Sequence, residues 1–460
     1  MYASPGRMVL LIRMREGDLG YQTERGPRQA FEGPLGTTPT YDAAACADAT
    51  ANWANETWTV DKPAAELWTY FMNDTCRPTD DPSQSCTLGN YGVYVITAES
   101  QGHVKAGIDF ARENNLRLIV RNTRHVFIGR STGWGALVIN THSFQDLVFS
   151  TEYTGPGNYT GGTNAQDPPV LVMTGECPTV GVAGSLVQGG GHGPLTPLYG
   201  MVADTALAFD VVTADGEFLR ANSEENPDLF WALMGGGPSS YGIVLSATFK
   251  TFPETKAASV IVNINSTLTN DTDVFWEGVR SFHKYSNTFV DAGLYAYFEL
   301  ATLRLHIAPF VGAGKTSAEM GAILKPSLFS STGHLWDAGH STPVSNSATH
   351  PRFRNSTDFA VVTLPVPVGT TWAQKEDLQN VLTNIQDAAM REAGPHGCAY
   401  VNEGDPYQPD WQDHFWGLEY PKLLEIRQKW DPNGVFYAIA TPGTEKWEVI
   451  EYGTRLCRKT

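Results

Sequence analysis

A glycine-rich stretch, GECPTVGVAGSLVQGGGHG, constrains this chain more than any other segment. Seven glycines lie between Gly175 and Gly193, and Cys177, one of six cysteines in the chain, stands among them. Bare backbone presents N–H donors that bind a diphosphate, and glycine lets a flat ring approach closely. The stretch therefore predicts a ligand-binding loop that carries one nucleophilic thiol.

A second loop, RNTRHVFIGRSTGWG, carries His125 beside further glycines. A thiol and an imidazole on such loops are nucleophiles that can be positioned against a bound group. From the spacing alone, a β protein with tight turns, one buried cysteine and one core histidine explains the two loops equally well.

Composition excludes two classes of partner. The chain has 460 residues, enough for two domains, and 42% of them are apolar. Its net charge of −17 repels nucleic acid and anionic lipid. No apolar run approaches the roughly 20 residues that cross a bilayer.

Other features favour a secreted glycoprotein. Six sites fit the Asn-x-Ser/Thr acceptor pattern: Asn55, Asn73, Asn158, Asn265, Asn270 and Asn355. Cys76 and Cys86 lie close together in a polar loop, where a disulfide or two free thiols fit. No signal peptide is evident, because MVLLI is shorter than the about 7–15 apolar residues of its core.

The order of predicted elements indicates an α+β protein. Residues 1–40 lack periodicity and are expected to be poorly ordered. A β-α-β unit follows over 93–121, with Val104, Ile108 and Ala111 on the apolar helix face. A hairpin turns at Asp215-Gly216, and a new region starts near residue 255. That region contains two paired strands, LYAYFEL and LRLHIAPFV, and a helix at about 375–393. This helix places Leu378, Val381, Leu382, Ile385 and Ala389 on one face.

Several familiar motifs are absent or incomplete. GAGKTS at 312–317 lacks the first glycine of a phosphate-binding P-loop, since Pro309 occupies that position, and it predicts a turn into a helix. His125, His142 and His192 lack metal-ligand spacing, so no metal is expected. The chain also has no Gly-x-Ser-x-Gly nucleophile elbow.

Taken together, these motifs resemble a known family. CTLGNYGVYVITAES, NLRLIVRNTRHVFIGRSTG, GECPTVGVAGSLVQGGGHG, LFWALMGGGPSSYGIV and LLEIRQKWDPNGVFYAIATPGTEKW are similar, in this order, to fungal FAD-linked oxidases of the berberine bridge enzyme type. These belong to the vanillyl-alcohol-oxidase superfamily, with its FAD-binding domain like that of p-cresol methylhydroxylase. The resemblance runs from about Tyr41 to Cys457.

The resemblance implies an architecture. We expect a two-subdomain FAD-binding domain over 41–254, an inserted α+β substrate domain over the flavin at 255–395, and a C-terminal return to the FAD-binding domain at 396–460.

It also implies a cofactor site. In the family, the histidine of the first loop bonds to the flavin C8-methyl group and the cysteine of the second bonds to C6, which are matched here by His125 and Cys177. The remaining expected FAD-binding residues are Asn122, Thr123, Arg124, Gly129, Ser131, Thr179, Val180, Gly181, Gly184, Gly189, Gly190, Gly191, Gly242 and Ile243.

Catalytic candidates lie in CAYVNEGDPY, which returns towards the flavin in the family. They are Tyr400, Asn402 and Glu403. Tyr400 is the preferred base, although a core aromatic explains it equally well, and a tyrosine is normally protonated at neutral pH. Tyr295, Tyr297 and His306 are candidates for the substrate face, and strand alternation puts the two tyrosines on one side.

Three departures from the family pattern stand out. The usual NTGHDF reads NTRHVF, so Arg124 replaces glycine and Val126 replaces aspartate. Arg124 is strained if that position needs a positive φ, or it meets the diphosphate as a cation. The segment before Cys177 is shortened, and Ser185 stands where relatives often carry glycine.

Together, the resemblance and the acceptor sites predict a monomeric FAD-dependent oxidoreductase that is secreted or resides in the secretory pathway. It would transfer hydride from a small alcohol, sugar or secondary metabolite to covalently bound flavin, with O2 as acceptor and H2O2 as product. A carbohydrate oxidase and a flavoprotein without turnover are the alternatives, and dehydrogenase activity also fits the residues.

Overall fold

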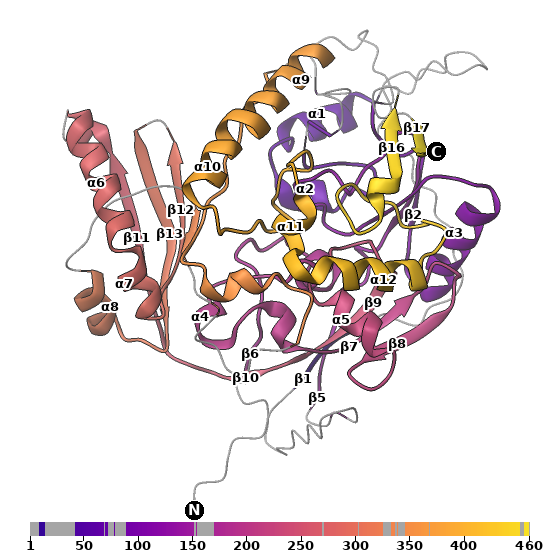
Figure 1. Cartoon of the computed structure of the whole chain (residues 1–460), viewed down its shortest axis with the longest axis horizontal. Coiled ribbons are helices and arrows are strands. Elements are labelled where there is room, and N and C mark those ends of the chain that lie inside the picture. The colour runs from indigo at the N-terminus through magenta and orange to yellow at the C-terminus, as the bar shows by residue number, and fades with distance from the viewer. Residues whose placement is uncertain are drawn as a thin grey trace, which may run out of the picture.

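In the computed structural model, two sheets form the half of the molecule that carries the two glycine-bearing loops, residues 121–135 and 175–193 (Figure 1). The first sheet is parallel, and its strands in spatial order are β2 (Tyr94–Thr97), β4 (Leu137–Asn140) and β3 (Leu118–Arg121). The second is antiparallel, in the order β5 (Asp146–Ser150), β1 (Val9–Arg13), β9 (Ile243–Lys250), β7 (Ala206–Val212) and β8 (Phe218–Asn222). The residues described are 9–13, 42–68, 70–71, 78, 89–150, 153, 170–268, 271–301, 303–324, 333–335, 338, 346–367, 369–450 and 455–459.

The predicted β-α-β unit is confirmed, with one difference. Helix α3 (Gln101–Glu113) is capped at its N-terminus by Ser100, whose hydroxyl accepts a hydrogen bond from His103 N. Its apolar face is buried as expected against the sheet. However, β4 lies between β2 and β3, so the two strands flanking the helix are not neighbours. This order places the loop after β3 next to the end of β4.

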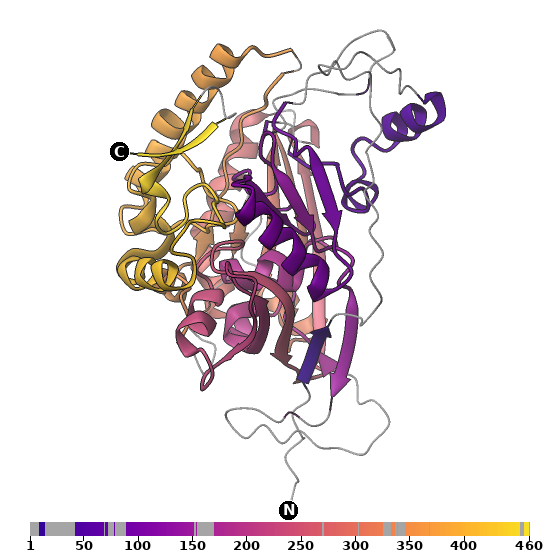
Figure 2. The same cartoon turned by 90° about the vertical axis from the view of Figure 1, so that its right-hand side faces the viewer.

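The expectation of poor order over 1–40 is wrong for one short segment. Val9–Arg13 form β1, which pairs with both β5 and β9 in the antiparallel sheet (Figure 2). The strand VLLIR is short and apolar, and its sheet position supplies hydrogen-bond partners on both edges. The other residues of 1–40, and the cysteine pair Cys76 and Cys86, lie outside the described residues.

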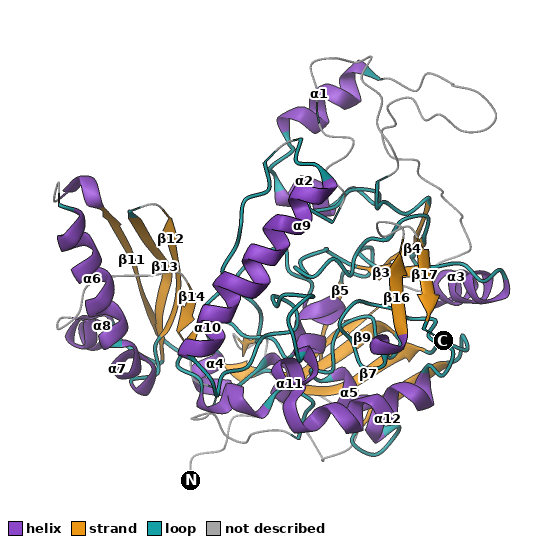
Figure 3. Ribbon diagram, turned by 45° about the horizontal axis from the view of Figure 1, so that its top comes forward, coloured by secondary structure: helices purple, strands orange, loops and turns teal. Residues whose placement is uncertain are grey.

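A separate sheet forms the middle of the chain. Its strands in spatial order are β11 (Ala257–Asn265), β13 (Arg304–Ala313), β12 (Tyr295–Ala301), β14 (Gly333–Leu335) and β15 (Asp358–Phe359). The helices on its outer face are α6 (Thr272–Lys284), α7 (Ser286–Asp291) and α8 (Ser317–Leu324) (Figure 3). The apolar core between them draws on residues 258–320. GAGKTS leads from β13 through a turn into α8, as predicted.

The predicted helix at 375–393 forms, but its buried face differs from the expected one. It consists of α9 (Trp372–Val381), a π-helical turn over Leu382–Gln386, and α10 (Asp387–Ala393). Ile385 is 63% exposed, whereas Lys375 and Thr383 are buried. A π turn inserts an extra residue per turn and rotates the faces that follow, so a periodicity of 3.6 misplaces them.

The remaining elements complete both halves. They are α1 (Ala43–Ala51), α2 (Glu56–Val60), α4 (Thr196–Tyr199), α5 (Pro227–Leu233), α11 (Trp411–Trp416), α12 (Tyr420–Trp430), the pair β6 (Val170–Leu171) and β10 (Phe252–Pro253), and the pair β16 (Trp447–Ile450) and β17 (Arg455–Arg458). Residues of 399–440 pack into the core of the glycine-loop half. Among the described helices, none has both the length and the apolar character needed to cross a bilayer.

Candidate FAD site

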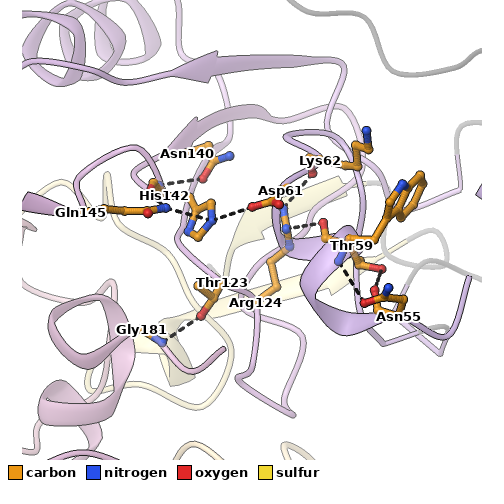
Figure 4. A network of polar contacts seen from close by, with 11 residues as sticks. Asn55, Thr59, Asp61, Lys62, Thr123, Arg124, Asn140, His142, Gln145 and Gly181 are labelled. Carbon is orange, nitrogen blue, oxygen red and sulfur yellow. Dashed lines mark hydrogen bonds and ion pairs between the residues drawn. The ribbon is translucent and has the colours of Figure 1, made fainter. Parts of the chain in front are cut away.

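The two glycine-bearing loops interlock. The loop after β3 begins with Asn122 and Thr123, and Thr123 Oγ1 accepts a hydrogen bond of 3.0 Å from Gly181 N (Figure 4). A Cβ on Gly181 or Gly184 would lie 2.3 or 2.6 Å from the Asn122 side chain. Only glycine permits this approach, so the glycine pattern is a packing requirement between the two loops.

The C-terminal return closes the site from a third side. A Cβ on Gly189 would lie 2.3 Å from Asn402 Nδ2, and Asn402 O accepts a hydrogen bond of 2.8 Å from Phe127 N. Gly190 and Gly191 have φ of +108° and +73°, which L side chains rarely adopt. The sequence CAYVNEGDPY is thus brought against both loops, as expected from the resemblance.

A cavity lies between β3, the glycine run and the start of β9. Seven predicted cofactor residues line it: Asn122, Thr123, Arg124, Ser131, Gly184, Gly242 and Ile243. Ser185, the third departure from the family pattern, lines it as well. Arg121 and Arg130 add two buried cations, and burial lowers the pKa of each to about 9. Their Nε atoms have no hydrogen-bond partner among the described residues. A positively charged cavity with unused N–H donors fits an anionic ligand.

The other predicted cofactor residues do not line this cavity. His125, Cys177 and Thr179 form a cluster described below, Val180 packs against the core, and Phe71 lies where a Cβ on Gly129 would be.

His125 and Cys177 come together, although 51 residues separate them. Thr179 Oγ1 lies 2.7 Å from His125 Nε2 and 3.3 Å from Cys177 Sγ. One nitrogen of His125, Cys177 Sγ and a carboxylate oxygen of Glu56 all lie within 4.8 Å of one another. Burial lowers the pKa of His125, with Glu56 opposing the shift, so its imidazole is neutral and nucleophilic at neutral pH.

Of the two alternatives for Arg124, the structure shows the strained backbone. Its φ is +69°, which costs a non-glycine residue about 1–2 kcal/mol. The terminal nitrogens of its guanidinium group bind backbone carbonyls at the end of α2 and not the cavity. Nη1 donates a hydrogen bond of 3.0 Å to Lys62 O, and Nη2 donates one of 2.6 Å to Thr59 O (Figure 4). Val126, in place of the family aspartate, is buried in the core.

The catalytic candidates, Tyr400, Asn402 and Glu403, form a second cluster. Tyr400 is 2% exposed, and its hydroxyl oxygen accepts hydrogen bonds from Asn402 Nδ2, at 3.0 Å, and from the backbone of Gly191. Burial raises the pKa of the Tyr400 hydroxyl further above its usual value of 10. It also raises the pKa of the Glu403 carboxyl, which is only partly exposed to solvent, to about 7. Glu403 therefore exchanges a proton near neutral pH, and Tyr400 remains a neutral phenol.

The middle sheet contributes its inner face to this cluster. Tyr295 is fully buried against Tyr400, and Tyr297 is partly buried beside them, so the two tyrosines share a side as predicted. Burial raises the pKa of both, with the charges of Glu176 and Glu403 adding to the shift. His306 lies opposite Glu299 in the strand register, and its Nδ1 is hydrogen-bonded to Asn263 Oδ1. It therefore lies on the same face of the sheet as the two tyrosines, farther along the strands.

Two acidic residues of the site were missed in the sequence. Glu176 precedes Cys177, and burial, with the charge of Glu403, raises its pKa to about 8. Glu56 comes from α2, far from both loops in the chain. The only signal for Glu176 was its position beside the cysteine, and nothing in the local pattern pointed to Glu56.

Comparisons with known proteins identify the family. Residues 93–222 match the FAD binding domain model, and residues 399–439 match the berberine and berberine-like model. The FAD-linked oxidoreductase ZEB1 of Gibberella zeae is 32% identical over 92% of this chain and 89% of its own length. The chain belongs to the FAD-linked oxidoreductases of the berberine bridge and vanillyl-alcohol-oxidase type.

Two further findings agree with this family. The VAO-type flavoprotein oxidase VAO615 of Thermothelomyces thermophilus is 30% identical over 91% of this chain and 88% of its length. The crystal structure of the VAO-type flavoprotein MtVAO615 from Myceliophthora thermophila C1 aligns with a TM-score of 0.81 at 26% identity, covering 92% of each chain. The protein is thus an FAD-dependent oxidoreductase with the α+β fold of its family.

The residues present fit FAD. The Nε atoms of the buried Arg121 and Arg130, which are unpartnered among the described residues, suit the diphosphate, and the glycine-rich stretch 175–193 offers backbone without side chains to the flavin ring.

Proposed function

We propose that this FAD-dependent oxidoreductase holds its flavin covalently through His125 and Cys177. The observation that carries the proposal is the convergence of these two side chains on Thr179, on loops whose neighbouring residues Arg124, Val126 and Gly184 line the cavity. A neutral imidazole is the form of histidine that bonds to carbon, and the lowered pKa of His125 supplies it. Two attachments from separate loops would fix the ring against both.

We further propose oxidation of a small alcohol, sugar or secondary metabolite, with O2 as the acceptor and H2O2 as the product. When bound, FAD supplies the two-electron chemistry, and the protein supplies position and electrostatics. The description of VAO615 as an oxidase supports O2 as acceptor. Among the described residues of the site, none favours a sugar over the other substrates. The proposal therefore includes a carbohydrate oxidase.

Glu403 is the proposed proton acceptor from the substrate. A general base works best when its pKa lies near the working pH, and Glu403 meets this condition while Tyr400 does not. This replaces the sequence-based preference for Tyr400, which instead donates a hydrogen bond or packs against the substrate. Asn402 orients Tyr400 and links it to the glycine run through Ser185 O.

Covalent attachment is tested on the purified, air-exposed protein. The protein should be yellow, and the colour should remain with the chain after acid denaturation. Tryptic peptides that contain His125 and Cys177 should carry the mass of the flavin. Cys177→Ala should keep a single attachment through His125, and complete release of flavin from this variant would contradict the histidine bond.

Turnover is tested with a substrate panel under anaerobic conditions. A substrate should bleach the flavin absorbance, and admitting air should restore it with one H2O2 per cycle. Bleaching without recovery in air would indicate a dehydrogenase. Protein that binds FAD and is bleached by no alcohol, sugar or aromatic metabolite would contradict the proposed activity and favour a flavoprotein without turnover.

We also propose that the protein is secreted and glycosylated. Asn55, Asn265 and Asn355 are exposed, as an acceptor must be, whereas the other three acceptor sites lie outside the described residues. Protein from a eukaryotic secretory host should lose mass on treatment with a glycosidase, and an unchanged mass would contradict the proposal.

A further inference from the structure

Glu56 contacts both proposed attachment residues from a separate helix. It is the first residue of α2, and its Oε2 lies 3.5 Å from Cys177 Sγ and 3.4 Å from Thr179 Oγ1. Thr179 Oγ1 in turn lies 2.7 Å from His125 Nε2. One carboxylate is therefore within reach of the thiol directly and of the imidazole through one hydroxyl.

Arg124 holds this carboxylate in place. Its backbone is next to His125, its carbonyl accepts a hydrogen bond of 2.9 Å from Trp68 Nε1, and its guanidinium binds the carbonyls of Thr59 and Lys62. Helix α2 has only five residues and is too short to be stable alone. The departure from glycine at Arg124 thus docks α2, and with it Glu56, onto the histidine loop.

Attachment of a flavin needs deprotonated nucleophiles. The thiolate, and not the thiol, is the nucleophilic form of cysteine. An imidazole whose Nε2–H is held by a hydrogen bond presents the lone pair of Nδ1 to its other side. An acidic oxygen close to both groups meets both needs, and no other carboxylate among the described residues lies in this close set.

We propose that Glu56 is the proton acceptor that drives covalent flavin attachment in this protein. Its carboxylate takes the proton of Cys177, and through Thr179 it holds the Nε2 proton of His125 so that Nδ1 is the bonding nitrogen. The inference rests on the proposed covalent linkage and adds the residue that promotes it.

The atoms and electrons of each attachment balance with O2 as the oxidant. At Cys177, the S–H bond and the flavin C6–H bond break and an S–C6 bond forms. At His125, one C–H bond of the C8-methyl group breaks and a bond forms between Nδ1 and that carbon, and the Nε2–H bond then breaks as its proton passes through Thr179 to Glu56. Each attachment releases two protons and leaves two electrons on the flavin, and one O2 per attachment takes up these two electrons and two protons to give one H2O2.

The test compares flavin attachment in the full-length wild type, Glu56→Gln, Glu56→Asp and Glu113→Gln. Glu113 is an exposed carboxyl on α3 outside this cluster, which makes its variant the charge-matched control. Total FAD is measured as the sum of acid-released and retained flavin, and each site is measured as the modified fraction of its tryptic peptide, over a time course in air.

Glu56→Gln is expected to keep total FAD near one per chain while attachment at Cys177 slows by about tenfold or more, because a positioned base contributes typically about 10²–10⁴-fold. Glu56→Asp should recover part of the rate, and Glu113→Gln should equal the wild type. Thr179→Val should slow attachment mainly at His125.

Three outcomes would overturn the inference. The first is attachment in Glu56→Gln as fast as in the control, and the second is equal rates for Glu56→Gln and Glu56→Asp. The third is loss of total FAD from Glu56→Gln, which would show that Glu56 acts in folding or binding and not in attachment. Absence of flavin from both peptides of the wild type would instead refute the covalent linkage itself.

Discussion

Replacing Glu403 by glutamine should change the pH dependence of stability in a direction fixed by its pKa. Burial raises the pKa of this carboxyl from 4.5 to about 7. A group whose folded pKa is raised stabilises the fold fully below its unfolded pKa, and that contribution is lost as pH rises through the folded pKa. The wild type should therefore lose stability between about pH 4.5 and about pH 7 on account of Glu403.

The magnitude follows from the size of the shift. At about 1.4 kcal/mol per pH unit, the rise of the pKa from 4.5 to about 7 corresponds to at most about 3.5 kcal/mol, and this value is reduced because solvent reaches part of the side chain. Glutamine has nearly the same shape and no charge, so Glu403→Gln should match the wild type at about pH 4 and exceed it by about 1–3 kcal/mol at about pH 8. The raised pKa of Glu176 acts in the same direction in both proteins.

Thermal unfolding followed by tryptophan fluorescence at the two pH values is the assay. The melting temperature of Glu403→Gln should rise relative to the wild type as pH increases, whereas that of Glu113→Gln should follow the wild type. A difference between Glu403→Gln and the wild type that stays constant from acid to alkaline pH would refute the assignment of the raised pKa. The same variant should reduce its flavin about 10²–10⁴-fold more slowly with substrate and lose the rise in rate through neutral pH.

The other predictions concern the packing of the site. Arg124→Gly should relieve about 1–2 kcal/mol of backbone strain but lose two charge-assisted hydrogen bonds of about 1.5–3 kcal/mol each, so its melting temperature should fall; an increase would contradict the docking role. Gly189→Ala places a Cβ 2.3 Å from Asn402 Nδ2, and purified protein should retain much less FAD, whereas full FAD content would show that the loop can shift. Asp204→Asn leaves the nearly buried Arg354 without its ion-pair partner and should destabilise the protein by about 3–5 kcal/mol, measured by denaturant unfolding; a loss under about 1 kcal/mol would contradict a desolvated pair.

The sequence alone determined the features that depend on nearby residues. The strand-helix-strand pattern, the Asp215-Gly216 turn and the helix after GAGKTS follow from local periodicity and turn chemistry, and each is present. The pattern also located the loops of His125 and Cys177, because clustered glycines mark such loops in the sequence itself, whereas it left open whether Arg124 has a positive φ. The resemblance, carried by these same motifs, identified the family.

Only the tertiary structure decided what depends on contacts between distant segments. It placed β4 between β2 and β3, gave Val9–Arg13 two strand neighbours, and rotated the far half of the α9–α10 helix through a π turn. It also brought Glu56 to His125 and Cys177, the proposed attachment residues, and partly buried Glu403, which made Glu403 the proposed base. Hydrogen-bond partners and desolvation depend on the distant segments that pack against a residue. Local periodicity in the sequence does not identify these segments.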